Sequence, residues 1–213
     1  MFLDYTATHS DAKIRYRASD MFLMVHSDAS YLTESKARSR AGGYFFLTGM
    51  PADPLRQPLA TDPTRPNNGC IHTECRIMKM VVASAAEAEM GALHYNAGEA
   101  CSFRTALEEM GHKQPPAHIQ VDNSTVAGIS NNTVKQKRSK AMDMRFYWIL
   151  DRIRQGQFQV FWNKGSLNLG DYHTKHQSSK HHIEVRSTYL HTARANFAHA
   201  FSKQFSKLLP QPL

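Results

Sequence analysis

The change in the spacing of apolar residues at Ser84 constrains the fold of this chain more than any other feature. Before it, residues 21–28 and 44–49 form apolar runs, and residues 71–77 alternate apolar with polar positions. After it, apolar residues recur at helical spacing to about residue 110. A period of two is typical of a half-exposed strand, and a period of 3.6 of an amphipathic helix. The sequence therefore predicts three strands followed by a long helix.

Strand and helix signals alternate in the second half of the chain. Two more apolar strand segments end at Asp122 and Trp162. We expect a short helix after Ser124, a long helix over about 137–155, and the start of a last helix within 168–176. This order favours an α/β fold, in which a mixed five-stranded sheet has flanking helices and its first three strands form an antiparallel meander.

The length and composition of the chain indicate one globular domain with extensions. Its 213 residues leave little room for two domains, and a hydrophobic content of 41% argues against disorder. We expect the domain to span residues 21–176, with a proline-rich surface loop at 50–69. Residues 1–20 would be an N-terminal extension, and residues 177–213 a polar, histidine-rich tail.

Charge and cysteine content narrow the class of protein. No run of 18 apolar residues occurs, so we expect no membrane-spanning helix, and the N-terminus lacks the apolar stretch of a secretory signal. Three cysteines cannot all pair within one chain, which favours free thiols and an intracellular location, cytoplasmic or nuclear. The net charge of +8 favours an anionic partner, with nucleic acid as the leading candidate.

Three aspartates share a position in the expected fold. Asp28, Asp122 and Asp171 each lie where a strand ends or a helix begins, and small or polar residues follow them. Ligands gather at such ends of α/β sheets, and Mg²⁺ prefers carboxylate oxygens. An aspartate at a strand end most often caps a turn, so only convergence of the three in space would make a metal site.

Five segments of the chain resemble the RNase H domain of Ty1/copia-type retrotransposon polyproteins: HSDAS (26–30), SAAEAEMGAL (84–93), QVDNS (120–124), RSKAMDMRFYWI (138–149) and NLGDYHTKH (168–176). The resemblance implies an RNase H-like fold and cleavage of the RNA strand in RNA/DNA hybrids. It implies two Mg²⁺ or Mn²⁺ ions and an upstream reverse transcriptase domain as a possible partner. The catalytic and metal-binding residues that it implies are Asp28, Glu89, Asp122 and Asp171.

Two glutamates compete for the second place in this site. Glu87 and Glu89 project about 200° apart around a helix, so they cannot both enter one site. Ser84 and Glu87 form a capping-box pattern, in which Glu87 would reach back to the backbone of Ser84. Glu89 is then free to face the aspartates, and the family's pattern of glutamate, large apolar residue, any residue and alanine also matches Glu89–Ala92. We therefore assign the site to Glu89.

A basic helix is the expected nucleic-acid-binding surface. Arg138, Arg145 and Arg152 recur every seven residues, so they would line the side of the helix away from its apolar stripe. Such a row can follow a phosphate backbone, although a solvated helix face would show the same pattern. Further candidates are Asn123 and Ser124 for the sugars, where a 2′-hydroxyl distinguishes RNA from DNA, and Lys175 for a phosphate.

Other interpretations of these features stay open. A catalytically inactive remnant of the same fold would bind nucleic acid without cleaving it, and an integrase-like strand transferase would rely on a sparser acidic triad. A zinc site at Cys70, His72 and Cys75 is disfavoured, because the last two would point to opposite faces of a strand. Cellular RNase H enzymes carry a mobile histidine before the last aspartate, whereas here the histidines at 173 and 176 follow it.

Overall fold

The structure, a computed structural model, describes residues 2–131 and 143–192. Contacts within the chain divide it into two units, of which the larger is Ala18–His176 and the smaller combines Met1–Arg17 with Gln177–Leu213. The larger unit contains the sheet and every candidate site residue. None of the helices in the described ranges has the length and apolar character that crossing a membrane requires.

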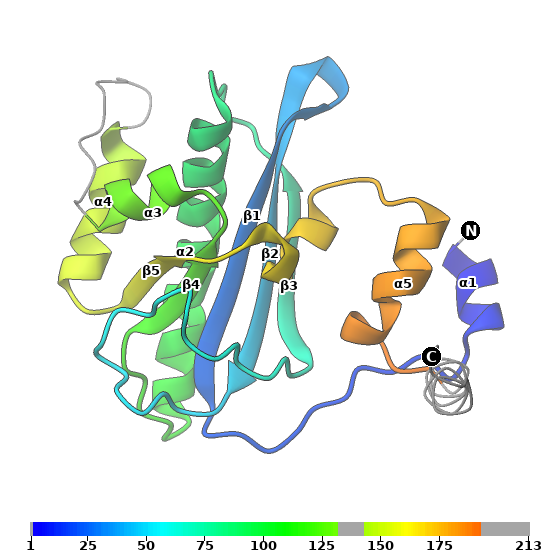
Figure 1. Cartoon of the computed structure of the whole chain (residues 1–213), viewed down its shortest axis with the longest axis horizontal. Coiled ribbons are helices and arrows are strands. Elements are labelled where there is room, and N and C mark those ends of the chain that lie inside the picture. Colours follow the sequence, from blue (N-terminus) through cyan, green and yellow to red (C-terminus); the bar gives the residue numbers. More distant parts are fainter. Residues whose placement is uncertain (1, 132–142, 193–213) are drawn as a thin grey trace, which may run out of the picture. The chain divides into compact units, whose positions relative to one another are not determined.

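The larger unit is built on one mixed sheet in the order β3-β2-β1-β4-β5 (Figure 1). β1, β2 and β3 pair in antiparallel fashion in succession, and β4 and β5 run parallel to β1. The predicted fold class, including the antiparallel meander, is therefore confirmed. The strands are β1 (Phe22–Glu34), β2 (Arg38–Thr48), β3 (Cys70–Ile77), β4 (Ala117–Val121) and β5 (Phe158–Trp162).

One face of the sheet is packed against helices. Val25, Phe45 and Ile119 point from their strands into a single core that also contains Leu93 and Ile149 from the helices. The helices are α2 (Ala85–Glu109), α3 (Ser124–Ser130) and α4 (Asp143–Arg154). The long helix expected over about 137–155 corresponds to α4, and its predicted beginning falls in 132–142, outside the described residues.

The opposite face of the sheet is covered by the proline-rich connection, drawn in cyan in Figure 1. The hydroxyl of Tyr44 donates to the carbonyl of Asn68 at 3.2 Å, and the guanidinium of Arg65 lies 5.3 Å from the centre of the Phe22 ring. The predicted surface loop therefore also packs on the sheet. Its low content of large apolar residues is compensated by polar and cation–π contacts to aromatic rings.

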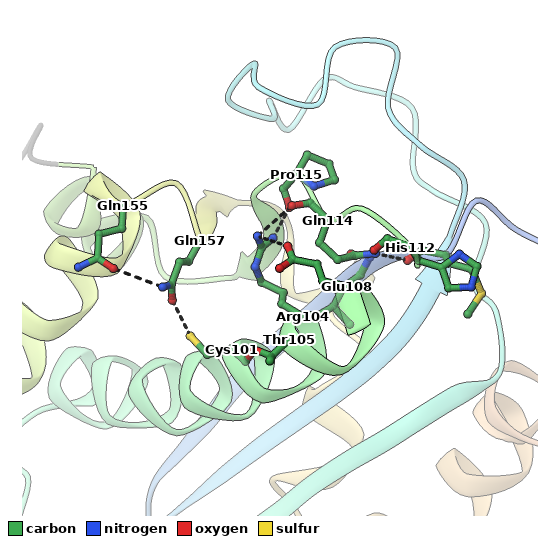
Figure 2. A network of polar contacts seen from close by, with 11 residues as sticks. Cys101, Arg104, Thr105, Glu108, His112, Gln114, Pro115, Gln155 and Gln157 are labelled. Carbon is green, nitrogen blue, oxygen red and sulfur yellow. Dashed lines mark hydrogen bonds and ion pairs between the residues drawn. The ribbon is translucent and has the colours of Figure 1, made fainter. Parts of the chain in front are cut away.

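Polar side chains fasten the C-terminal half of α2 to the chain around it (Figure 2). Arg104 donates to the carbonyls of Gln114, at 2.9 Å, and Pro115. The side chain of Gln114 in turn accepts from the backbone N–H of Leu23 at 3.2 Å and donates to the carbonyl of Met21 at 2.9 Å. These bonds fix the start of β1 beside the segment that leads into β4. β1 and β4 run parallel and both begin at this end. Asp28 and Asp122 come later in the two segments, so they lie toward the other end.

In its described residues, 2–17 and 177–192, the smaller unit has the helices α1 (Phe2–Thr8) and α5 (Ser179–Tyr189). Residues expected to be a polar tail thus include a helix. Ser178 caps it by accepting from the backbone N–H of His181, and the rings of Tyr5 and His182 meet edge to face at 5.6 Å. Sequence reasoning missed this helix because it lacks a clear apolar stripe.

Candidate metal centre

Asp28 and Asp122 lie just beyond the parallel pairing of β1 with β4. That pairing ends at His26 and Gln120, and each aspartate follows two residues later. β1 continues to Glu34 along β2, so Asp28 lies within a strand rather than at its end, contrary to the prediction. Because β1 loses one neighbour at this point, the sheet leaves room there for carboxyl groups from other elements.

Glu89 enters this space from the N-terminal part of α2. One of its carboxylate oxygens accepts from the backbone N–H of Ala29 at 3.2 Å. Ligand oxygens of Asp28, Glu89 and Asp122 all lie within 4.8 Å of one another, the single such group of three found among the described residues. The second oxygen of Glu89 is buried without a hydrogen-bond partner in this part of the chain.

The competing glutamate has a structural task. Ser84 caps α2 by accepting from the backbone N–H of Glu87 at 3.2 Å, as the capping pattern predicts. The carboxylate of Glu87 reaches back to the N–H of Ala83 at 2.8 Å, rather than to that of Ser84 as expected. The structure therefore brings Glu89, and not Glu87, to the aspartates.

The electrostatics of the three carboxyl groups favour a bound cation. Burial raises the pKa of Asp28 to about 7, although a hydrogen bond from Thr174 opposes the rise. Burial also raises the pKa of Glu89 and of Asp122, and the neighbouring carboxylates add to both effects. Each group is thus poorly stabilised as an anion in the protein alone. A divalent cation would stabilise all three anions, and the orphaned Glu89 oxygen fits a metal ligand.

Asp171 lies beside this group rather than within it. It belongs to a short 3₁₀ turn, Asp171–His173, and not to the beginning of an α-helix as expected. Its carboxylate accepts a hydrogen bond from the ammonium of Lys175. Burial is the largest cause of the raised pKa of Asp122, and the negative charge of Asp171 is the second. The two carboxylates are therefore close. Three of the four predicted ligands therefore converge, and the fourth is paired with a lysine.

Thr174 and its neighbours hold Asp28 in place. The hydroxyl of Thr174 donates to a carboxylate oxygen of Asp28 at 2.6 Å, and the side-chain amide of Asn168 donates to the carbonyl of Ser27 at 2.8 Å. A Cβ at Gly170 would lie 3.0 Å from a β1 carbonyl, so glycine permits this close approach. Sequence reasoning missed these positioning residues, although Thr174 lies within a segment that carried the resemblance.

Two further buried polar groups stabilise β1 beside the site. His26 accepts from the backbone N–H of Leu169 at 3.0 Å, and burial lowers the pKa of its ring to about 3, which keeps it neutral. From α2, Asn96 donates to the hydroxyl of Ser27 at 2.8 Å and to the carbonyl of Gly42 at 2.9 Å. These bonds set the position of α2, and hence of Glu89, along the strand.

The candidate nucleic-acid-binding residues fall into two groups. Asn123, Ser124 and Lys175 form the first group, and each lies within four residues of the candidate ligand Asp122 or Asp171 in the sequence. The side-chain oxygen of Asn123 caps α3 by accepting from two backbone N–H groups, and Ser124 is exposed. Lys175 is half exposed while it binds Asp171.

The arginines of α4 differ from expectation. Arg145 is half-buried and lines a small cavity with Met90 and Gly91 of α2. The guanidinium of Arg152 lies 5.3 Å from the centre of the Trp148 ring. Both side chains are thus partly within the fold rather than on its exposed side. Arg138 lies outside the described residues.

No second metal group appears in residues 2–131 and 143–192. All three cysteines are free thiols, as expected. Cys75 donates to the carbonyl of His173, whereas His72 packs between the rings of Phe45 and Phe103. The arrangement gives no support to a zinc site. The ring of His173 lies over that of Tyr44, and His176 is exposed.

Known proteins resemble this chain in sequence and in fold. No family model matches the chain. The chain is 23% identical over 160 residues to the retrovirus-related Pol polyprotein from transposon TNT 1-94 of Nicotiana tabacum, a match that covers 75% of this chain and 11% of the polyprotein. It therefore spans a small part of that relative's length. The predicted resemblance to a domain of a retrotransposon polyprotein is supported.

Two solved structures show the fold. LC11-RNase H1, isolated from compost by a metagenomic approach, aligns with a TM-score of 0.50 and 12% identity, covering 72% of this chain and 93% of that one. A structure of LC11-RNase H1 in complex with an RNA/DNA hybrid aligns with the same TM-score and identity, covering 71% and 93%. The chain therefore has the RNase H fold.

Proposed function

We propose that this RNase H-like domain is a metal-dependent endoribonuclease that cleaves the RNA strand of RNA/DNA hybrids. The observation that carries the proposal is the convergence of Asp28, Glu89 and Asp122, with one Glu89 oxygen buried and unpaired. Support comes also from LC11-RNase H1, which shares the fold and was solved with such a hybrid. The similarity to a Pol polyprotein favours an intracellular role as the C-terminal part of a Ty1/copia-type polyprotein, with an upstream reverse transcriptase domain.

In this proposal the four carboxylates Asp28, Glu89, Asp122 and Asp171 hold two Mg²⁺ or Mn²⁺ ions. Such ions, when bound, activate a water molecule and stabilise the leaving oxygen of a phosphodiester. Thr174 orients Asp28 through its hydroxyl. Lys175 bonds one carboxylate oxygen of Asp171, which leaves the other oxygen able to serve as a ligand, and its ammonium lies where it can also meet a substrate phosphate.

Contacts to the nucleic acid are assigned to residues around this centre. Ser124 is exposed, and the amide nitrogen of Asn123 is not used by the helix cap, so both can reach a sugar hydroxyl. Arg138, Arg145 and Arg152 are proposed to contribute long-range attraction for the phosphate backbone, because two of them are partly committed to contacts within the fold.

A cleavage assay on a labelled RNA/DNA hybrid with Mg²⁺ or Mn²⁺ tests the proposal. Wild type should cut the RNA strand, and Asp28→Asn and Glu89→Gln should not. Glu87→Gln is the matched control, because its carboxylate accepts from the N–H of Ala83 and does not belong to the group of three carboxylates. Equal cleavage by wild type and Asp28→Asn would contradict the metal-site assignment. Wild type that binds the hybrid but never cuts it would instead identify an inactive nucleic-acid-binding remnant.

A further inference from the structure

A groove of about 510 Å³ lies between the proline-rich connection and α3. Small residues leave it open, and the side chains that line it carry no charge. Those that matter here are Leu59 and Ala60 of the connection, Ala127 and Gly128 of α3, and Phe161 and Trp162 of β5. The groove is wide and open to solvent rather than enclosed. The site described above does not use this groove.

Trp162 links the groove to the candidate metal centre. Its indole N–H donates to the backbone carbonyl of Asp122 at 2.9 Å, so the ring is attached to the residue that supplies a candidate metal ligand. The side chain nevertheless keeps 38% of its surface exposed. An indole has a single donor and no strong acceptor. With that donor already used, Trp162 has only the surface of its ring to offer a ligand.

The chemistry of this groove fits an unpaired nucleobase. A fixed aromatic ring binds bases by stacking, which tolerates any sequence because each base has a π-face. Lys164, two residues further along the chain, is exposed and adds a positive charge close to Trp162 in the sequence. The net charge of +8 favours a negatively charged nucleic-acid strand over a neutral ligand. Bases within a duplex are already paired and stacked, so the occupant has to be single-stranded.

We infer that this groove binds an unpaired nucleotide next to the cleavage site, by stacking its base on Trp162. The inference rests on the proposed function, since it takes the strand held at Asp122 as the source of that nucleotide. It adds a substrate preference: hybrids with single-stranded extensions bind more tightly than blunt hybrids. Because stacking carries no charge, the part of this preference that Trp162 supplies does not depend on salt concentration.

Fluorescence offers a direct test, since the chain has only two tryptophans. The other is Trp148, which packs at the edge of the helical core, so Trp148→Phe leaves Trp162 as the single reporter. The titration uses Ca²⁺ in place of Mg²⁺ and compares a blunt hybrid with one that carries single-stranded extensions on both strands. The extended hybrid should quench Trp162 and the blunt hybrid should not. Equal quenching by the two, or none by either, would overturn the inference.

Two substitutions separate stacking from the hydrogen bond to Asp122. Trp162→Phe keeps an aromatic face and loses the N–H, so it should retain most of the affinity for the extended hybrid. Trp162→Ala should bind it about 5- to 150-fold more weakly, the loss typical of one stacked base, with an unchanged dependence on salt. Equal weakening by both substitutions would overturn the inference, because the residue would then act only by positioning Asp122. Circular dichroism of each variant checks that the fold is retained.

The outcome for the groove can be told apart from the outcome for the proposed function. If wild type cuts hybrids and Trp162→Ala binds extended and blunt hybrids as wild type does, the groove inference fails while the nuclease stands. If wild type never cuts, yet a single-stranded oligonucleotide quenches Trp162 and Trp162→Ala weakens its binding, the groove inference stands without the nuclease.

Discussion

Replacing Asp28 by asparagine should stabilise the metal-free protein at neutral and higher pH. Burial raises the pKa of this carboxyl from 3.8 to about 7, so the folded protein binds more protons than the unfolded chain between these values. Stability is therefore lost as pH rises through this window, and above it the ionised carboxylate destabilises the fold. At 1.36 kcal/mol per pH unit, the difference is about 4 kcal/mol. Asp28 is only 2% exposed, so solvent screening removes little of it.

Urea unfolding in EDTA at pH 5 and pH 8 measures this effect. Asp28→Asn keeps an oxygen that can accept from Thr174, so the variant removes the charge with little change in packing. It should exceed wild type in stability at pH 8 by up to about 4 kcal/mol, and by less at pH 5. Asp151→Asn, at an exposed position of α4, is the control and should change stability little at either pH.

Divalent cations should reverse this order of stability between wild type and Asp28→Asn. Mg²⁺ or Mn²⁺ binds the folded wild type and stabilises it in proportion to RT ln(1 + [L]/Kd), whereas Asp28→Asn has lost a ligand and gains less. Two results would refute the reasoning. One is a variant no more stable than wild type at pH 8 in EDTA, and the other is equal stabilisation of both proteins by the cation.

Other predictions concern residues that support the site and the core. Thr174→Val should lower metal affinity or cleavage by about 10- to 100-fold, the loss that is typical when a metal ligand loses its hydrogen-bond partner. Thr174→Ser keeps the hydroxyl and should not. Gly43→Ala places a Cβ 2.2 Å from the side-chain oxygen of Asn96 and should cost about 1–3 kcal/mol in urea unfolding, with partial recovery in the double variant with Asn96→Ala. As the pH falls from 6.5 toward 3, His26 should contribute a loss of stability, because its ring binds a proton in the unfolded chain but has a pKa of about 3 in the folded protein. Asp28 contributes the opposite trend, so the quantity to measure is the stability of wild type relative to His26→Asn, which should fall as the pH is lowered. Ile149→Ala, at a fully buried core position, should cost about 2–5 kcal/mol in the same unfolding assay, and a smaller cost would contradict its place in the core.

The sequence by itself determined the five strands, the helices that pack on them, and their order. Alternation over residues 71–77 and helical spacing after Ser84 depend only on near neighbours, and the cap of α2 lies where its pattern predicts. The same local argument separated Glu89 from Glu87, since residues two apart on a helix point in different directions. The extent of β1 was not predictable in this way, because its pairing with β2 carries it beyond Asp28.

Only the tertiary structure decided how the side chains meet. The spacing of Arg145 and Arg152 places them on one side of α4, but the neighbouring helix decides whether that side is buried. Thr174 and Asp28 are 146 residues apart in the chain, so no local pattern reports their hydrogen bond. Lys175 and Asp171, by contrast, are only four residues apart, but the packed structure alone shows that Asp171 lies beside the group of three carboxylates rather than within it. Local periodicity could supply candidate ligands, but their convergence is a long-range property that depends on packing between elements distant in sequence.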